Sequence, residues 1–148
     1  MSGNGTMQLI GKAAALAAIL LAGTSGAAAQ RADPTAAALN RCLNAAANAS
    51  TAGQTGCEAS ALRSYDQRMN VAYTALLRSL PAGAAQQLRR SQRAWLAFRD
   101  TERSAIGGIY ATRQGTMYVP MQAGAVSSLT RDRALQLETY RRVMTIGP

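Results

Sequence analysis

The stretch from Cys57 to Leu80, CEASALRSYDQRMNVAYTALLRSL, constrains the fold more than any other segment of the chain. Its apolar residues recur at steps of three and four, a spacing that places them on one face of an α-helix. They are Leu62, Tyr65, Met69, Ala72, Leu76 and Leu80. Because such a helix must bury its apolar face against another element, the rest of the chain has to supply a partner.

Further helices are predicted on both sides of this segment. TAAALNRCLNAAANA, from Thr35 to Ala49, is rich in helix formers and is followed by turn-forming residues from Ser50 to Gly56. After a break at Pro81 to Gly83, a third helix is predicted from about Ala84 to Ile106. Gly107 and Gly108 are expected to end it.

The segment from Ile109 to Pro120 has turn formers and no sustained period, so it is predicted to be a loop. Apolar residues return at helical spacing from Met121 to about Met144, which predicts a fourth helix. No strand run, internal repeat or domain boundary is evident. We therefore predict an all-α fold, a small hairpin or bundle of about four helices.

The first 29 residues have the pattern of a secretory signal peptide. Lys12 precedes an apolar run, and small residues precede Gln30. Cleavage after Ala29 would leave one helical domain, residues 30–148. The apolar run is too short to span a bilayer, and Thr24 stands where a lipoprotein would need a cysteine. We expect a periplasmic or secreted protein that is not anchored to the membrane.

Cys42 and Cys57 are the only cysteines, and an exported chain meets an oxidising compartment. A disulfide between them is therefore the expected state, and it would join the first helix to the start of the second. Two isolated thiols in a chain without histidine cannot make a zinc site. We expect neither a metal nor another cofactor.

Polar residues border the apolar stripes of the predicted helices. On the third helix, Leu88, Ser91, Trp95 and Phe98 gather on the side expected to face the core. Gln92, Arg99 and Glu102 lie beside this stripe. Asp66 and Tyr73 flank the stripe of the second helix, and Thr130 and Arg133 lie on the stripe of the fourth. Half-buried charges must be paired. We therefore predict an internal network in which Asp66 and Glu102 neutralise Arg99 and Arg133, rather than an active site.

Residues 30–148 carry fifteen arginines and seven acidic residues, a net charge of +8 (15 minus 7). Such a charge attracts anionic polymers, and it also keeps a small protein soluble. Arg89, Arg90 and Arg93 form an outward basic strip on the third helix. The sequence has neither a nucleic-acid reading motif nor exposed aromatic residues interleaved with this strip, so no nucleic-acid partner is expected.

Several segments resemble the LprI-like lysozyme inhibitor family. They are the C-x14-C pair, YDQRMNVAY from Tyr65, LRRSQRAWLAFRD from Leu88, GTM from Gly115 and LTRDRALQL from Leu129. The motif residues that carry the resemblance are Asp66, Asn70, Tyr73, Gln92, Trp95, Arg99, Asp100, Thr130 and Arg133.

The resemblance implies a secreted or periplasmic helical domain, with lysozyme inhibition in at least one branch and no catalytic residues or cofactor. It also implies two further cysteines in many relatives, at places that hold residues such as Arg103 and Ala125 here. Their joint absence leaves Cys42 to pair with Cys57. The motif residues are expected to be mainly structural.

The first functional hypothesis is an interaction protein that blocks a peptidoglycan-cleaving enzyme, with Tyr110, Met117 and Tyr118 of the predicted loop as contacts. Because common lysozymes are basic, a binding protein of charge +8 would need an acidic contact patch. Asp100, Glu102 and Glu138 are the candidates.

Two alternatives stay open. One is an envelope accessory module whose arginines bind anionic polymers such as teichoic acid or lipopolysaccharide. The other is a glycosidase that uses Asp66 and Glu102 as its carboxylate pair. Without histidine and with both thiols expected to be oxidised, serine and cysteine triads are disfavoured. We expect a protein that is not an enzyme.

Overall fold

The computed structural model describes residues 33–146. They form four α-helices and one 3-10 turn, and no strand occurs in this part of the chain. The elements are α1 (Pro34–Asn44), η1 (Ala46–Asn48), α2 (Thr51–Ser79), α3 (Ala82–Ala111) and α4 (Tyr118–Val143). The predicted all-α fold is confirmed. The predicted signal peptide, with Lys12 and Thr24, lies outside the described residues.

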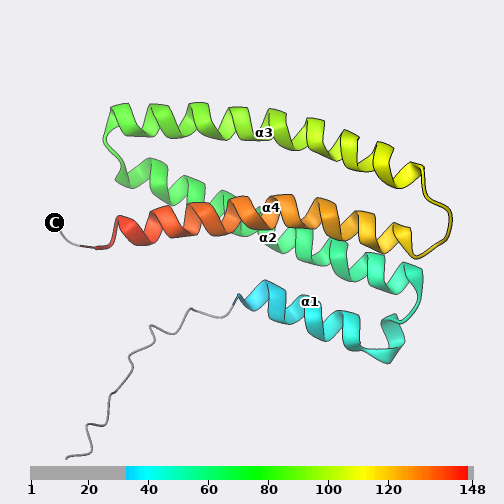
Figure 1. Cartoon of the computed structure of the whole chain (residues 1–148). Helices are drawn as coiled ribbons and strands as arrows, with labels where there is room; N and C mark the ends of the chain where they lie inside the picture. Colours follow the sequence, from blue (N-terminus) through cyan, green and yellow to red (C-terminus); the bar gives the residue numbers. More distant parts are fainter. Residues whose placement is uncertain (1–32, 147–148) are drawn as a thin grey trace, which may run out of the picture. The chain divides into compact units, whose positions relative to one another are not determined.

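The helices differ in how they pack (Figure 1). The most extensive interface is between α2 and α4, which are not consecutive in the sequence. Helix α1 packs on α2, whereas α3 packs mainly on α4 and has little contact with α2, although a single short turn joins α2 to α3. None of the helices in the described residues is long and apolar enough to cross a membrane.

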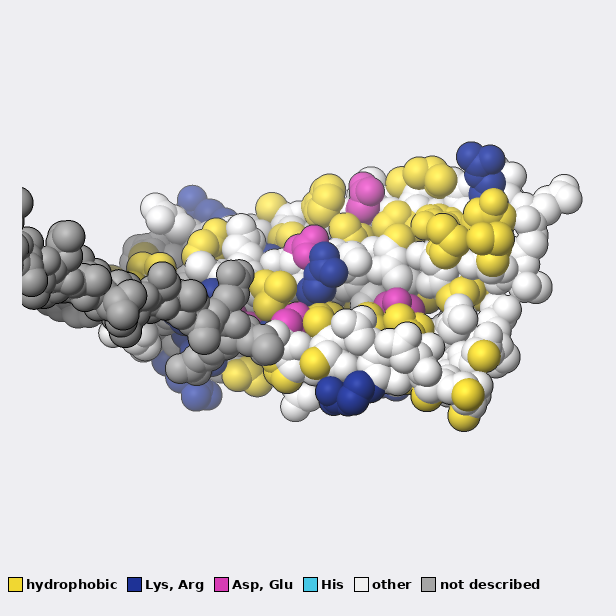
Figure 2. All heavy atoms as spheres, turned by 60° about the horizontal axis from the view of Figure 1, so that its bottom comes forward, with side chains coloured by type: hydrophobic (Ala, Val, Ile, Leu, Met, Phe, Trp, Pro, Cys, Tyr) yellow, Lys and Arg dark blue, Asp and Glu magenta, His cyan; other side chains and the backbone are white. Residues whose placement is uncertain are grey.

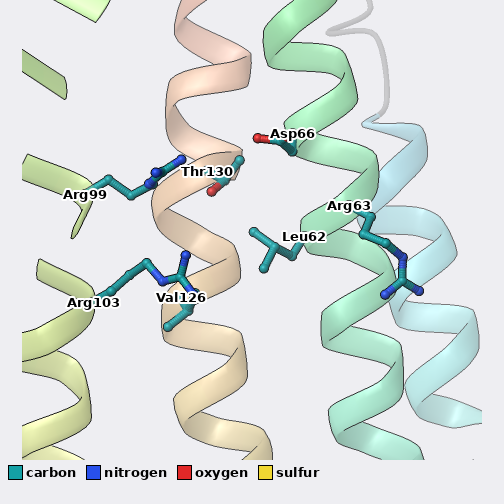
Figure 3. A pocket seen from close by; sticks show the side chains of 7 residues that line it. All are labelled: Leu62, Arg63, Asp66, Arg99, Arg103, Val126 and Thr130. Carbon is teal, nitrogen blue, oxygen red and sulfur yellow. The ribbon is translucent and has the colours of Figure 1, made fainter. Parts of the chain in front are cut away.

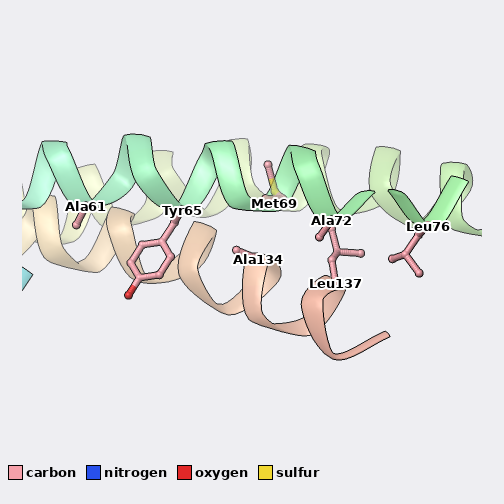
Figure 4. Packing of buried hydrophobic residues seen from close by; sticks show 7 residues of the cluster. All are labelled: Ala61, Tyr65, Met69, Ala72, Leu76, Ala134 and Leu137. Atoms are coloured by element: carbon pink, nitrogen blue, oxygen red, sulfur yellow. The ribbon is translucent and has the colours of Figure 1, made fainter. Parts of the chain in front are cut away.

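The core lies between α2 and α4 (Figure 4). Tyr65, Met69, Ala72 and Leu76 of the predicted stripe are buried there against Ala134 and Leu137. The periodicity of α2 is thus confirmed as the face that organises the domain. Complete burial of a side chain such as Leu76 or Leu137 contributes roughly 1.5–3 kcal/mol to stability.

The predicted turn from Ser50 to Gly56 is wrong, because α2 begins at Thr51. The Ser50 hydroxyl caps the helix by accepting a hydrogen bond of 3.1 Å from the Gly53 amide. Gly53 also lies against η1, where a Cβ atom would come within 2.7 Å of the Asn48 Cα. Gly53 therefore permits a close contact within the helix rather than marking a turn.

The third helix does not end at Gly107 and Gly108 but continues to Ala111. Each glycine costs a helix only about 1 kcal/mol, and Gly107 lies against the Gln122 side chain of α4. The predicted loop from Ile109 to Pro120 is therefore too long. The observed connection is residues 112–117, in which Gly115 has a positive φ of 115°.

The predicted disulfide between Cys42 and Cys57 is confirmed, with the two Cα atoms 5.7 Å apart. It joins α1 to the first turns of α2 across η1. No covalent bond makes a similar connection between α3 and α4 in the described residues.

Candidate functional site

Motif residues from α3 and α4 meet around Trp95, which is half-buried and packs against the core. The guanidinium carbon of Arg99 lies 5.5 Å from the centre of an indole ring, and that of Arg133 lies 5.9 Å away. Both distances fit cation–π contacts. Two arginines of the motif therefore pack against the same aromatic ring.

Arg133 is only 6% exposed, yet no carboxylate of residues 33–146 pairs with it. Its Nε donates to Gln92 Oε1 at 2.9 Å, its Nη1 to Gln136 Oε1 at 2.5 Å, and its Nη2 to Ser91 Oγ at 3.2 Å. Burial lowers the pKa of the Arg133 guanidinium, although arginine stays protonated in proteins. Neutral oxygens and the Trp95 ring thus hold a buried cation.

The predicted pairing of Asp66 and Glu102 with the two arginines is wrong. Arg99 donates through Nε and Nη2 to its neighbour Asp100, at 2.9 and 2.7 Å. Asp66 accepts a hydrogen bond of 3.1 Å from Asn70 on its own helix. These partners lie one and four positions away in the sequence. Residues of the same helix, rather than residues of other helices, therefore form the hydrogen bonds of Arg99 and Asp66.

Two other side chains around this cluster can be placed. Gln92 is buried, and its Nε2 lies 3.6 Å from Met69 Sδ, a weak contact that links α3 to the core face of α2. Tyr73 is half-buried and packs against the core. Phe98, expected to face the core, is 52% exposed because α3 contacts its neighbours over only part of its surface.

A second polar cluster, which we call the Arg68 cluster, was not predicted from the sequence. Arg68 donates through Nε and Nη2 to the two carboxylate oxygens of Glu138, both at 2.8 Å. Its Nη1 donates to Asp33 Oδ1 and, at 3.0 Å, to Thr35 Oγ1. Tyr65 donates to the other Asp33 oxygen at 2.8 Å. The cluster thereby joins α1, α2 and α4.

Charge and burial shift the pKa values in the Arg68 cluster. Hydrogen bonds to Glu138, then to Asp33, raise the pKa of Arg68 against the effect of burial. Burial raises the pKa of Asp33, but hydrogen bonds from Tyr65, Arg68 and the Ala36 amide outweigh it, so this pKa lies below its usual value. Burial and the bond to Asp33 raise the pKa of Tyr65. The fold therefore favours a charged Asp33 and Arg68 with a neutral Tyr65.

The Arg68 cluster had one signal in the sequence. Asp33 precedes Pro34, and Asp followed by Pro is typical of the start of a helix. Asp33 indeed caps α1, accepting from the Thr35 amide at 3.0 Å. The pairing with Glu138 had no such local signal.

A cleft of about 280 Å³ opens between α2, α3 and α4 (Figure 3). Three motif residues, Asp66, Arg99 and Thr130, line it together. The remaining lining residues are Leu62, Arg63, Arg103 and Val126. Glu102 does not line the cleft, so the carboxylate pair considered for a glycosidase is not brought together there.

The end of the molecule where α3 is joined to α4 exposes apolar side chains. We call residues 109–121 the hairpin tip. Ile109, Met117, Val119 and Met121 are between 49% and 62% exposed, whereas Tyr110 and Tyr118 are half-buried. Figure 2 shows hydrophobic side chains at this end of the molecule, on the right. The predicted contact residue Met117 is thus open to a partner, and the two tyrosines are less so.

The fold and these clusters define a small disulfide-linked domain of four helices with a polar cleft and an apolar tip. The family model described as lysozyme inhibitor LprI matches residues 42–137, and the chain belongs to this family. The resemblance noted in the sequence is confirmed.

A crystal structure of an uncharacterized protein from Burkholderia thailandensis is similar to this chain, with a TM-score of 0.73 and 35% sequence identity. The similarity covers 78% of this chain and 56% of that one, so this chain spans little more than half of its length. No curated protein sequence matches the chain.

Proposed function

We propose that this protein is an exported inhibitor that binds a lysozyme or another peptidoglycan-cleaving enzyme, and that the hairpin tip makes the contact. Membership in the lysozyme inhibitor LprI family supports the class of partner. The exposed apolar side chains of the tip support the place, because large apolar residues at the centre of an interface supply most of its binding energy.

The distribution of charge carries this assignment of the tip. Between Ser104 and Thr130 the chain has a single charged residue, Arg113, whereas its other arginines lie outside this segment. A basic enzyme approaching the tip therefore meets little like charge close to the contact, and interface centres are generally poor in charged residues.

Two of the three acidic residues considered from the sequence as a contact patch are less suitable. Glu138 is held by Arg68, and Asp100 is held by Arg99, so docking on either carboxylate would compete with an internal ion pair. The tip, whose single charged residue is Arg113, needs no such exchange, and this favours it over those two carboxylates.

An inhibition assay tests the proposal. The oxidised protein, produced without residues 1–29, is added to basic and acidic lysozymes acting on peptidoglycan, at low and at near-physiological salt. Dose-dependent inhibition that persists in salt is expected, because an apolar contact is screened little. Replacement of both Met117 and Val119 by serine should abolish it, whereas replacement of Arg89, Arg90 and Arg93 by glutamine should not.

The binding of anionic envelope polymers remains the second candidate, and the exposure of Arg89, Arg90 and Arg93 on α3 favours it. In that case the arginine substitutions should abolish binding, and the serine substitutions at Met117 and Val119 should not. Lysozyme activity would be unchanged, and binding to lipopolysaccharide or teichoic acid would be lost at high salt and in the triple arginine variant.

A further inference from the structure

The cleft between α2, α3 and α4 has chemically different walls (Figure 3). Arg99 and Arg103, one helical turn apart on α3, reach in from one side, and Asp66 of α2 lies on the other side. Val126 and Thr130 of α4 lie between them, with Leu62 as an apolar neighbour. A ligand here would meet two guanidinium groups on the α3 side, a hydroxyl with apolar groups, and on the α2 side the Asp66 carboxylate, with Arg63 on the same helix.

The polar groups of the cleft keep hydrogen-bonding capacity. Asp100 occupies Nε and Nη2 of Arg99 but leaves Nη1, and Arg103 makes no hydrogen bond within residues 33–146. Asn70 occupies only one oxygen of Asp66. Thr130, only 3% exposed as a residue, also lines the cleft. The free Arg99 and Arg103 donors and the free Asp66 oxygen can therefore form hydrogen bonds to a bound ligand.

From this arrangement we infer that the cleft binds the carboxyl terminus of a short peptide with small side chains. The terminal carboxylate lies against Arg99 and Arg103, where guanidinium groups give strong charge-assisted hydrogen bonds. The preceding amide N–H donates to Asp66, and a methyl side chain packs against Leu62 and Val126. A volume of about 280 Å³ is at the small end of ligand pockets, which suits two residues rather than a longer segment. This inference does not depend on the enzyme-binding role of the hairpin tip.

Two sources can provide such a carboxylate, namely ordinary proteins and the D-alanine-containing peptides of peptidoglycan. Acetyl-L-alanyl-L-alanine and acetyl-D-alanyl-D-alanine represent them as probes. The C-terminal amide of each is a matched control of the same shape without the charge. The only tryptophan of the chain, Trp95, reports binding by fluorescence because the Arg99 guanidinium stacks on its ring at 5.5 Å.

Titration of the oxidised protein with these probes tests the inference, with calorimetry as a second readout. We expect saturable binding of at least one free carboxylate and affinity lower by about tenfold or more for its amide, since a hydrogen bond to a charged group is lost. Arg103→Gln should weaken the binding by a similar factor. Arg93→Gln, an exposed arginine of the same helix outside the cleft, is the matched control and should leave it unchanged.

Several results overturn the inference. They are the absence of saturable binding by both peptides, equal binding of acid and amide, and equal losses in the Arg103→Gln and Arg93→Gln variants. Inorganic phosphate that binds as tightly as the peptides would reduce the cleft to a general anion site and reject the peptide. Because Arg103 is exposed and makes no hydrogen bond in the described residues, its substitution should leave the melting temperature unchanged, so lost binding cannot be attributed to unfolding.

Discussion

Arg68 and Arg133 lie on opposite sides of the α2–α4 interface and are held in different ways. Arg68 makes a bidentate ion pair with Glu138 and a second ion pair with Asp33, which brings two carboxylates from α4 and the start of α1 to one guanidinium. Arg133 is more deeply buried but contacts neutral oxygens and the face of Trp95. The depth of burial therefore does not indicate which arginine is neutralised.

The difference teaches where the domain depends on charge. On the side of α1, removal of one member of an ion pair leaves the oppositely charged member without compensation. A disulfide also joins α1 to α2. On the side of α3, neither an ion pair between helices nor a disulfide is present in the described residues, and the contact of α3 with α4 rests on Trp95 and its polar neighbours. We therefore expect α1 to be held firmly and α3 to be the more easily displaced helix.

The largest effect is expected from Arg68→Met. The substitution leaves Asp33 and Glu138 close together without a cation, and the loss of one partner of a largely buried pair costs about 3–4 kcal/mol. Urea unfolding followed by circular dichroism measures the change. Arg78→Met, an exposed arginine on the same helix, serves as the control and should change stability by less than about 0.5 kcal/mol. An equally small effect for Arg68→Met would show that the α1 side depends on ion pairs no more than the α3 side does.

Loss of the disulfide should have the next largest effect. Reduction, or replacement of both Cys42 and Cys57 by serine, frees a loop with a sequence separation of 15, which costs about 3 kcal/mol in the chain-entropy model. The rate of amide hydrogen exchange should rise most in α1, because α2 is the only long helix on which α1 packs. An increase spread equally over α1 and α3 would contradict the assignment of the bond to the firm side of the domain.

Acid should weaken the Arg68 cluster before it affects the Trp95 side. The pKa of Asp33 is lower in the folded state than its ordinary value of 3.8, so the unfolded chain binds a proton first as the pH falls. The stability that Asp33 contributes is complete above the ordinary pKa and is lost as the pH falls through the folded pKa. Urea midpoints at pH 6 and pH 3 should differ less in Asp33→Asn than in the natural protein. Equal differences in both proteins would show that other carboxylates cause the acid sensitivity.

The sequence predicted the helices well because their signal is local. The stripe from Tyr65 to Leu76 follows from spacing alone, and the structure buries it as predicted. The failures concern partners and ends. Phe98 falls on the expected core face of α3, but α3 has too little contact with its neighbours to cover it. The number of helices that cover a face depends on the packing of the whole chain. It therefore cannot be predicted from the local spacing of apolar residues.

The candidate site shows the same division. The motif residues were predicted to border the helical stripes, and Asp66, Arg99 and Thr130 do line one cleft. Their partners were not predictable, because Arg68 pairs with residues 35 positions before it and 70 positions after it. A pattern of residues indicates that a charge needs a partner, but it does not identify the carboxylate among seven that supplies it.

Arg133→Met gives the smallest effect and the sharpest form of the comparison. Because no carboxylate in the described part of the chain pairs with Arg133, its removal leaves no uncompensated charge there, and methionine can occupy the space beside Trp95. The main destabilisation comes from Gln92, whose buried Oε1 loses its hydrogen-bond donor. We therefore expect the free energy of unfolding to fall by about 1 kcal/mol. Replacing Gln92 by methionine as well should recover most of this loss, since both partners are then apolar. A loss as large as that of Arg68→Met, without recovery in the double variant, would mean that the charge itself stabilises the Trp95 side. Depth of burial, rather than the presence of a carboxylate, would then decide how much a buried arginine contributes here.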